Sequence, residues 1–123
     1  MGISDGRRND EGETEMRKEP GKIQRFEIGI GGYDDAMFGL SVTLGGKGWG
    51  VGDFDGTWTM EPGKNYKWNK QDQHKCWTDM CQRVLKLMQQ AKAKTTNDMV
   101  GVPVEVTFDG NKLDSWRILE EVL

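Results

Sequence analysis

One long amphipathic segment, residues 70–94, constrains the fold more than any other feature of the sequence. Apolar side chains recur there at steps of three and four residues, the spacing that places them on one face of an α-helix. Asn69 precedes the segment and Asp72 follows three residues later, which resembles a capping box with Asp in place of Glu or Gln. The sequence therefore predicts a helix of about six or seven turns from near Lys70 to near Lys94.

The predicted helix has two faces of opposite character. The inward face is expected to carry His74, Trp77, Met80, Cys81, Val84, Leu87, Met88 and Ala91. The solvent face is expected to carry Lys75, Asp79, Arg83, Lys86, Gln89, Gln90 and Lys92. The stretch 69–94 holds six Lys or Arg residues against two Asp residues, so the helix is a basic element in a chain whose net charge is −3.

On both sides of the helix the hydrophobic pattern changes to a period of two, which is typical of half-buried strands. Residues 22–30 and 38–44 alternate in this way before the helix, and residues 102–108 and 113–119 do so after it. The bulky residues of 49–58 depart from strict alternation, so we predict a third strand there that bends through a bulge.

The predicted elements follow the order strand, strand, strand, helix, strand, strand. Asp109 and Gly110 are a hairpin signal between the last two strands. This order predicts an α+β fold, a mostly antiparallel sheet of about five strands with one long helix packed on one face. Residues 22–123 are expected to form a single domain. Residues 1–21 are acidic and polar, so we expect a disordered tail.

The glycine-rich stretch GGKGWGVGDFDGTW, residues 45–58, raises the question of a bound ligand. Gly48, Gly50 and Gly52 give G-x-G-x-G, which is not a dinucleotide fingerprint, and no helix follows directly to receive a phosphate. The glycines are instead expected to permit close backbone approach and a bend opposite the bulky side chains.

Four aspartates raise the question of a bound metal cation. Asp53 and Asp55, with Asp34 and Asp35, could bind a hard cation, although position 64 is Lys where a calcium loop needs its closing Glu. Aspartates at turns and strand ends are the simpler interpretation.

No catalytic constellation emerges from the remaining reactive residues. His74 is the only histidine and lies two helical turns from Cys81, roughly 10 Å away and too far for one zinc ion or a Cys–His pair. Cys76 and Cys81 point about 140° apart around the predicted helix, so reduced thiols are expected. The sequence therefore predicts a protein that is not an enzyme and has neither cofactor nor metal, although a pair of carboxylates acting as acid and base stays open.

The best candidate for binding is a basic and aromatic stretch, residues 63–75. Its candidate site residues are Lys64, Tyr66, Lys67, Trp68, Lys70 and Lys75. Cations interleaved with aromatic rings can follow phosphates and stack on bases, so single-stranded nucleic acid is one partner. A protein partner with an acidic groove would use the same residues. In the alternative interpretation, Tyr66 and Trp68 form a hydrophobic staple over the helix and the lysines are solvated.

No apolar run reaches the length of a transmembrane span and no signal peptide is evident, so we expect a soluble, cytoplasmic protein without membrane contact. The sequence fixes neither the oligomeric state nor the order of strands in the sheet.

Two motifs resemble small proteins encoded by bacteriophages and prophages: the Gly-Trp-Gly-x-Gly-Asp-Phe stretch from Gly48, and the terminal run from Pro103 to Leu119. Such phage accessory proteins, anti-CRISPR proteins among them, often act by occluding a host enzyme or a defence complex. The resemblance implies a non-enzymatic inhibitor or modulator in the bacterial host cytoplasm, with a host or defence-system protein or ribonucleoprotein as its partner. It carries no catalytic motif.

Overall fold

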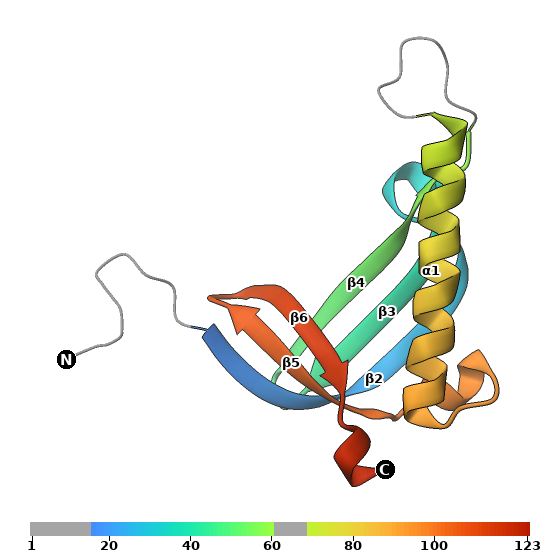
Figure 1. The fold of residues 1–123 in the computed structure, drawn as a ribbon. Helices are drawn as coiled ribbons and strands as arrows, with labels where there is room; N and C mark the ends of the chain where they lie inside the picture. The colour runs from blue at the N-terminus through green and yellow to red at the C-terminus, as the bar shows by residue number, and fades with distance from the viewer. Residues whose placement is uncertain (1–15, 61–68) are drawn as a thin grey trace.

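The computed structural model describes residues 16–60 and 69–123. Its helix and strands are β2 (Met16–Gly31), β3 (Met37–Gly46), β4 (Trp49–Trp58), α1 (Lys70–Ala91), β5 (Pro103–Asp109) and β6 (Lys112–Ile118). The strands form one antiparallel sheet in the order β4-β3-β2-β5-β6. Figure 1 shows α1 lying across β3 and β4, with the β5–β6 hairpin beside its lower half. The predicted α+β fold with one long helix on the sheet is confirmed.

Strand β2 is much longer than predicted and joins two halves of the sheet. Its first part, Met16 to Lys22, pairs with β5, and its second part, Lys22 to Gly31, pairs with β3. The prediction of a disordered tail is therefore wrong for residues 16–21, and residues 1–15 lie outside the described part. The polar composition of residues 16–21 did not predict this part of the strand, because its stability comes from pairing with the apolar β5.

Strand β4 carries the glycine-rich stretch without a bulge. Its partners on β3 run one to one from Trp58 opposite Met37 to Trp49 opposite Gly46, so the predicted bulge is wrong. The apolar residues of β4 depart from strict alternation because Asp53 and Asp55 occupy two positions on the helix side of the strand, where apolar residues were expected. The glycines do permit close approach, since a Cβ on Gly56 would collide with the carbonyl oxygen of Phe38.

Helix α1 begins as predicted, with Asn69 and Asp72 forming the capping box. It ends three residues before Lys94, because Lys92 adopts a left-handed conformation with φ of 58° and the Ala93 amide donates to the Met88 carbonyl. Arg83 was predicted on the solvent face but lies half-buried against β4, where two aspartates attract it. No helix among residues 16–60 and 69–123 is long and apolar enough to span a membrane.

The core lies between α1 and the two parts of the sheet. Its buried apolar residues are Ile23, Phe26, Leu40, Val42, Leu44, Met80, Val84, Met99, Val102, Val104, Val106, Phe108 and Ile118. Met99 belongs to a short 3₁₀ helix, η2 (Thr96–Met99), which the sequence pattern did not reveal. The Asp98 carboxylate accepts from the Lys94 and Thr95 amides, so this connection from α1 to β5 is capped and anchored.

Candidate binding surface

The predicted basic and aromatic surface falls only in part within the described residues. Four of its six members lie outside them: Lys64, Tyr66, Lys67 and Trp68. Lys70 is the first residue of α1, and Lys75 follows in the next turn. The Lys75 ammonium contacts the Asp79 carboxylate at 2.7 Å, and this hydrogen bond raises the pKa of Lys75. The positive charge of Lys75 is therefore balanced within the helix itself.

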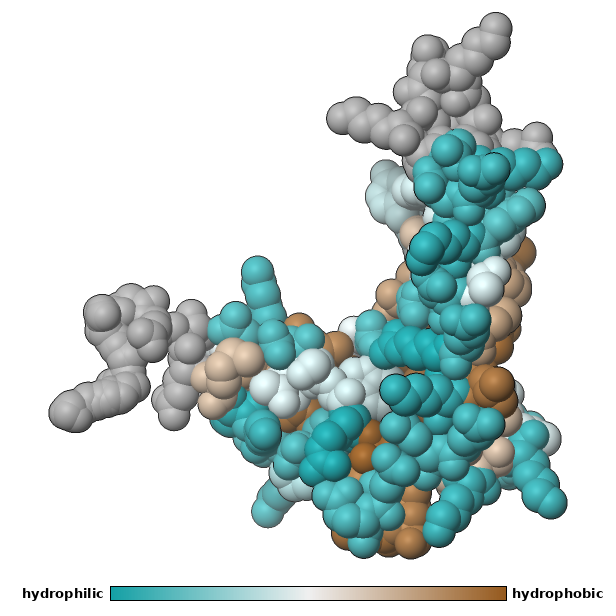
Figure 2. Space-filling model, viewed as in Figure 1, coloured by the Kyte–Doolittle hydropathy of each residue, from teal (hydrophilic) through white to brown (hydrophobic). Residues whose placement is uncertain are grey.

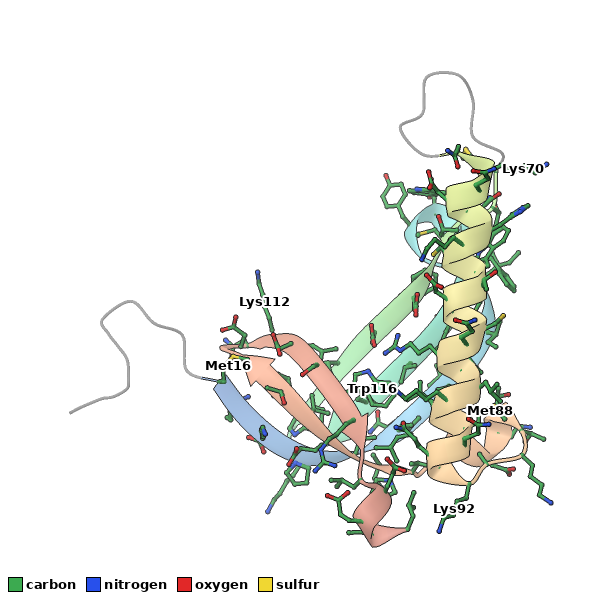
Figure 3. The ribbon with its side chains drawn as sticks, in the orientation of Figure 1. Met16, Lys70, Met88, Lys92, Lys112 and Trp116 are labelled. Carbon is green, nitrogen blue, oxygen red and sulfur yellow. The ribbon has the colours of Figure 1, made fainter. Side chains whose placement is uncertain are left out.

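Asp53 and Asp55 form ion pairs with Arg83, so the cation beside these carboxylates is an arginine side chain of the same chain. The Arg83 guanidinium donates to Asp53 Oδ2 at 2.8 Å and to Asp55 Oδ2 at 3.1 Å. Trp116 Nε1 also donates to Asp53 Oδ2 at 2.8 Å, and the Arg83 guanidinium lies 5.7 Å from the centre of the Trp116 ring. Figure 3 shows Trp116 between β6 and α1.

The charges in this cluster perturb each other. Burial would raise the pKa of Asp53, but hydrogen bonds from Arg83 and Trp116 outweigh it, so the pKa lies below its ordinary value. Asp34 and Asp35 lie beyond the Met37–Trp58 pair in a separate turn. Among the described residues no group of three or more His, Cys, Asp and Glu side chains could hold a metal ion. The arrangement is that of a structural ion cluster bridging β4, β6 and α1.

A turn after β2 exposes a tyrosine at the end of the sheet. The 3₁₀ turn η1 (Tyr33–Asp35) links β2 to β3, and Tyr33 is 75% exposed. Asp34 and Asp35 have φ of 57° and 53°, the left-handed region that L-residues seldom adopt. Non-glycine residues in that region cost about 1–2 kcal/mol each, less for Asp, and such strain is concentrated at functional sites. The turn therefore holds Tyr33 outward at an energetic cost.

Tyr33 belongs to a group of residues that we call the distal cluster, in which Trp58 is half-buried and the others are exposed: Tyr33, Asp34, Asp35, Trp58 and Met60. The Tyr33 and Trp58 rings meet edge to face with centroids 6.4 Å apart. The cluster combines an aromatic pair, a methionine side chain and two carboxylates on one end of the sheet.

Two sets of hydrogen bonds fix the backbone beneath the distal cluster. The Thr59 amide and hydroxyl both donate to the Ala36 carbonyl, which ties the end of β4 to the turn. From the helix, buried Gln73 donates through Nε2 to the Trp58 carbonyl at 2.7 Å and to the Met60 carbonyl at 3.1 Å. The cluster is therefore held on rigid elements from both sides.

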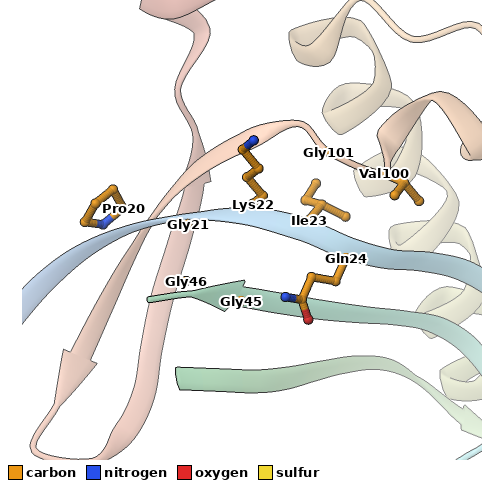
Figure 4. Close-up of a pocket in the computed structure, with 9 residues that line it drawn as sticks. All are labelled: Pro20, Gly21, Lys22, Ile23, Gln24, Gly45, Gly46, Val100 and Gly101. Carbon is orange, nitrogen blue, oxygen red and sulfur yellow. The ribbon is translucent and has the colours of Figure 1, made fainter. Parts of the chain in front are cut away.

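A shallow groove lies at the opposite end, where β2 bends (Figure 4). It is lined by Pro20, Gly21, Lys22, Ile23, Gln24, Gly45, Gly46, Val100 and Gly101. Lys22 is the one charged residue in this lining, so the groove brings together no acid and base pair. Gly21, Gly45 and Gly46 serve packing, since a Cβ on Gly45, for example, would collide with the Gln24 amide.

The remaining reactive residues are His74 and the two cysteines, all on α1. His74 is exposed on α1 and stacks on Trp77 with ring centroids 6.3 Å apart. Cys76 and Cys81 are free thiols. Burial raises the pKa of Cys76, and the carboxylates of Asp55 and Asp79 raise it further, which disfavours the nucleophilic thiolate.

Sequence reasoning did not single out Tyr33, Gln73 or Arg83. An exposed tyrosine followed by two aspartates in a short loop was the available signal for Tyr33. No local pattern marks Gln73 or Arg83, because their hydrogen-bond partners lie 13 to 30 residues away in the chain.

Comparison with known proteins finds no match: no protein-family model, no curated protein and no solved structure corresponds to this chain.

Proposed function

We propose that the protein is a non-enzymatic binding protein that inhibits or modulates a host or defence-system macromolecule, and that the distal cluster contacts this partner. The observation that carries the proposal is Tyr33, 75% exposed on a strained turn and packed against Trp58. Tyrosine and tryptophan are the side chains most often found as binding anchors. The choice of a host or defence partner comes from the resemblance to phage-encoded proteins.

The charge of the distal cluster favours a protein partner over nucleic acid. Asp34 and Asp35 directly follow Tyr33, so a phosphate backbone approaching the ring would meet negative charge. Lys75, one of the two predicted phosphate ligands within the described residues, is paired with Asp79. A protein surface that offers apolar side chains beside Lys or Arg is complementary to this arrangement.

The ionisable groups support a role in binding rather than catalysis. Asp53 and Asp55, the carboxylates closest to each other on the helix side of β4, are both engaged by Arg83. An acid and base pair needs groups free to exchange a proton with a substrate, whereas both carboxylates accept hydrogen bonds from Arg83 and the lowered pKa of Asp53 makes it a weaker base.

Affinity capture from a nuclease-treated bacterial host lysate tests the proposal. The full chain is expected to retain a protein at a fixed stoichiometry, and Tyr33→Ser is expected to weaken its binding. Loss of a central anchor costs about 2 kcal/mol, which is about 30-fold in Kd. Val122→Ser is the matched control, because Val122 is 63% exposed in a separate element, η3 (Glu120–Val122).

Three results would contradict the proposal. The first is a lysate that yields no stoichiometric protein, and the second is a Tyr33→Ser variant that binds as tightly as the unaltered chain. The third is salt-sensitive binding to labelled single-stranded oligonucleotides that replaces protein capture, which would favour the nucleic-acid function instead.

A further inference from the structure

The second part of β2 has an edge that no strand of residues 16–60 and 69–123 pairs with. Ile23 marks the limit of pairing on the β5 side: its amide donates to the Val102 carbonyl, and its carbonyl accepts from the Gly101 amide. Beyond Ile23, β2 pairs only with β3 among the described strands. Alternate backbone N–H and C=O groups from Arg25 to Gly31 therefore point away from the sheet and can pair with another strand.

The side chains along this edge are apolar on the helix side, while the other side carries Arg25 and Glu27 followed by Gly29 and Gly31. Ile28 and Ile30, opposite Leu40 and Phe38 of β3, are 42% and 69% exposed. On the other side, Gly29 and Gly31 leave open space, since a Cβ on either would have no neighbour within 4 Å. Figure 2 shows brown, apolar surface along the side of α1 that faces away from β6.

The devices that protect strand edges from pairing are weak in Arg25–Gly31. Proline, an inward-pointing charge or a bulge within the strand would prevent addition of another strand. Arg25–Gly31 contains no proline, and its one irregularity lies before it, between Ile23 and Arg25. Arg25 and Glu27, its two charged residues, form an ion pair with each other at 2.7 Å.

We infer that Arg25–Gly31 pairs antiparallel with the same strand of a second copy of this chain, around a twofold axis at Ile28. In that register Phe26 lies opposite Ile30 of the second copy, so Ile30, which is 69% exposed in one chain, is covered beside a buried ring. Arg25 and Glu27 lie opposite glycines. The strand is thus complementary to itself, as a twofold interface requires.

The neighbouring registers fit less well. An axis at Glu27 places two glutamates directly opposite each other, which is destabilising. An axis at Phe26 needs Gln24 and Ile23 to pair on the side where Val102 and Gly101 already bond to Ile23. An axis at Gly29 avoids both conflicts, but because β2 ends at Gly31 it pairs only residues 27–31. Ile28 is the centre that avoids both conflicts and pairs all of Arg25–Gly31.

Light scattering after size exclusion tests dimerisation with the full chain. The unaltered chain is expected to have twice its monomer mass of 13.9 kDa, with a concentration-dependent fraction of monomer. Ile30→Lys is expected to be monomeric. Val122→Lys is the matched control and should remain dimeric, because Val122 is 63% exposed in η3, which follows β6 at the other edge of the sheet. Circular dichroism establishes that each variant is folded.

Disulfide trapping tests the register. In a background of Cys76→Ser and Cys81→Ser, Ile28→Cys should crosslink two copies, since residues opposite each other in antiparallel strands have Cα atoms about 4.5–5.5 Å apart, within disulfide range. Glu27→Cys should crosslink far less. A monomeric unaltered chain, a dimeric Ile30→Lys variant, or crosslinking at residue 27 in preference to 28 would each overturn the inference.

Discussion

The two parts of β2 each leave one edge without a described neighbouring strand, but they carry different side chains there. Both parts carry an ion pair, Arg17–Glu19 and Arg25–Glu27, but the first part, Met16 to Lys22, also contains Pro20, which hinders pairing with another strand. The second part, Arg25 to Gly31, exposes two isoleucines between glycines. The difference teaches that an exposed edge is protected in one half of the same strand and left available in the other.

The two halves also differ in what surrounds them. The first part of β2 lies beside β5, and the Arg17 guanidinium covers the Phe108 ring at 4.9 Å from its centre. The second part leads into the strained turn that presents Tyr33. The distal cluster and the edge of Arg25–Gly31, the two proposed contact surfaces, therefore both lie at the second part of β2.

The largest expected effect on the free energy of unfolding comes from substituting Ile23, the residue where the two parts of β2 meet. Ile23 is 1% exposed at the point where β2 changes partners, so Ile23→Ala should lower the free energy of unfolding by about 2–5 kcal/mol. Ile23→Val keeps most of the side chain and should cost about 0.5–1.5 kcal/mol. Chemical denaturation measures both. A loss below about 1 kcal/mol for the alanine variant would show that the join is not a packed part of the core.

A smaller effect is expected from removing the ion cluster that bridges the halves. Asp53→Asn should lower the free energy of unfolding at neutral pH by about 1–3 kcal/mol, because Arg83 loses a charged acceptor in a half-buried site. The folded pKa of Asp53 lies below 3.8, so the carboxylate stabilises the fold above that pH. The stabilisation is lost as pH falls through the folded pKa.

Denaturation of the unaltered chain and of Asp53→Asn across acidic pH tests this sign. The two unfolding free energies should converge as the pH falls below 3.8. A difference that stays constant with pH, or that grows in acid, would contradict the role assigned to the Asp53 charge. Asp79→Asn is the control, since its exposed pair with Lys75 should contribute little.

The smallest expected effect concerns the turn after β2. Asp35 has a φ of 53°, so Asp35→Gly should raise the free energy of unfolding by about 0.5 kcal/mol, while Asp35→Ala should lower it by about 1 kcal/mol. Thermal unfolding measures the two variants side by side. If the alanine variant were the more stable one, the turn would not be strained in the way that its backbone indicates.

The sequence predicted those elements whose signals are local. Asn69 and Asp72 are three residues apart, and the alternation of Phe26, Ile28 and Ile30 requires only one strand. Gly110, with φ of 63°, forms the predicted turn between β5 and β6. Local spacing and turn chemistry act within a few residues, so they can be interpreted without knowing the fold.

Features that depend on distant partners could not be predicted. Met16–Gly21 forms a strand because β5 lies beside it, and Arg83 turns inward because β4 offers two carboxylates. The basic and aromatic surface predicted at Lys64 to Lys75 lies mostly outside the described residues and stays a prediction, whereas the contact of Tyr33 with Trp58 depends on the end of β4 and has no local signal. The exposure of a side chain depends on the folded chain, whereas the spacing of apolar residues can be seen in the sequence alone.

Hydrogen exchange along β2 at low and high protein concentration tests most directly whether its two halves differ. Amides of Arg25–Gly31 that point away from β3 should exchange rapidly in dilute solution and become protected at high concentration, and Ile30→Lys should abolish that protection. Amides of Arg17–Glu19 that point away from β5 should exchange rapidly at both concentrations. Protection that does not change with concentration, or that changes equally in both halves, would contradict the account.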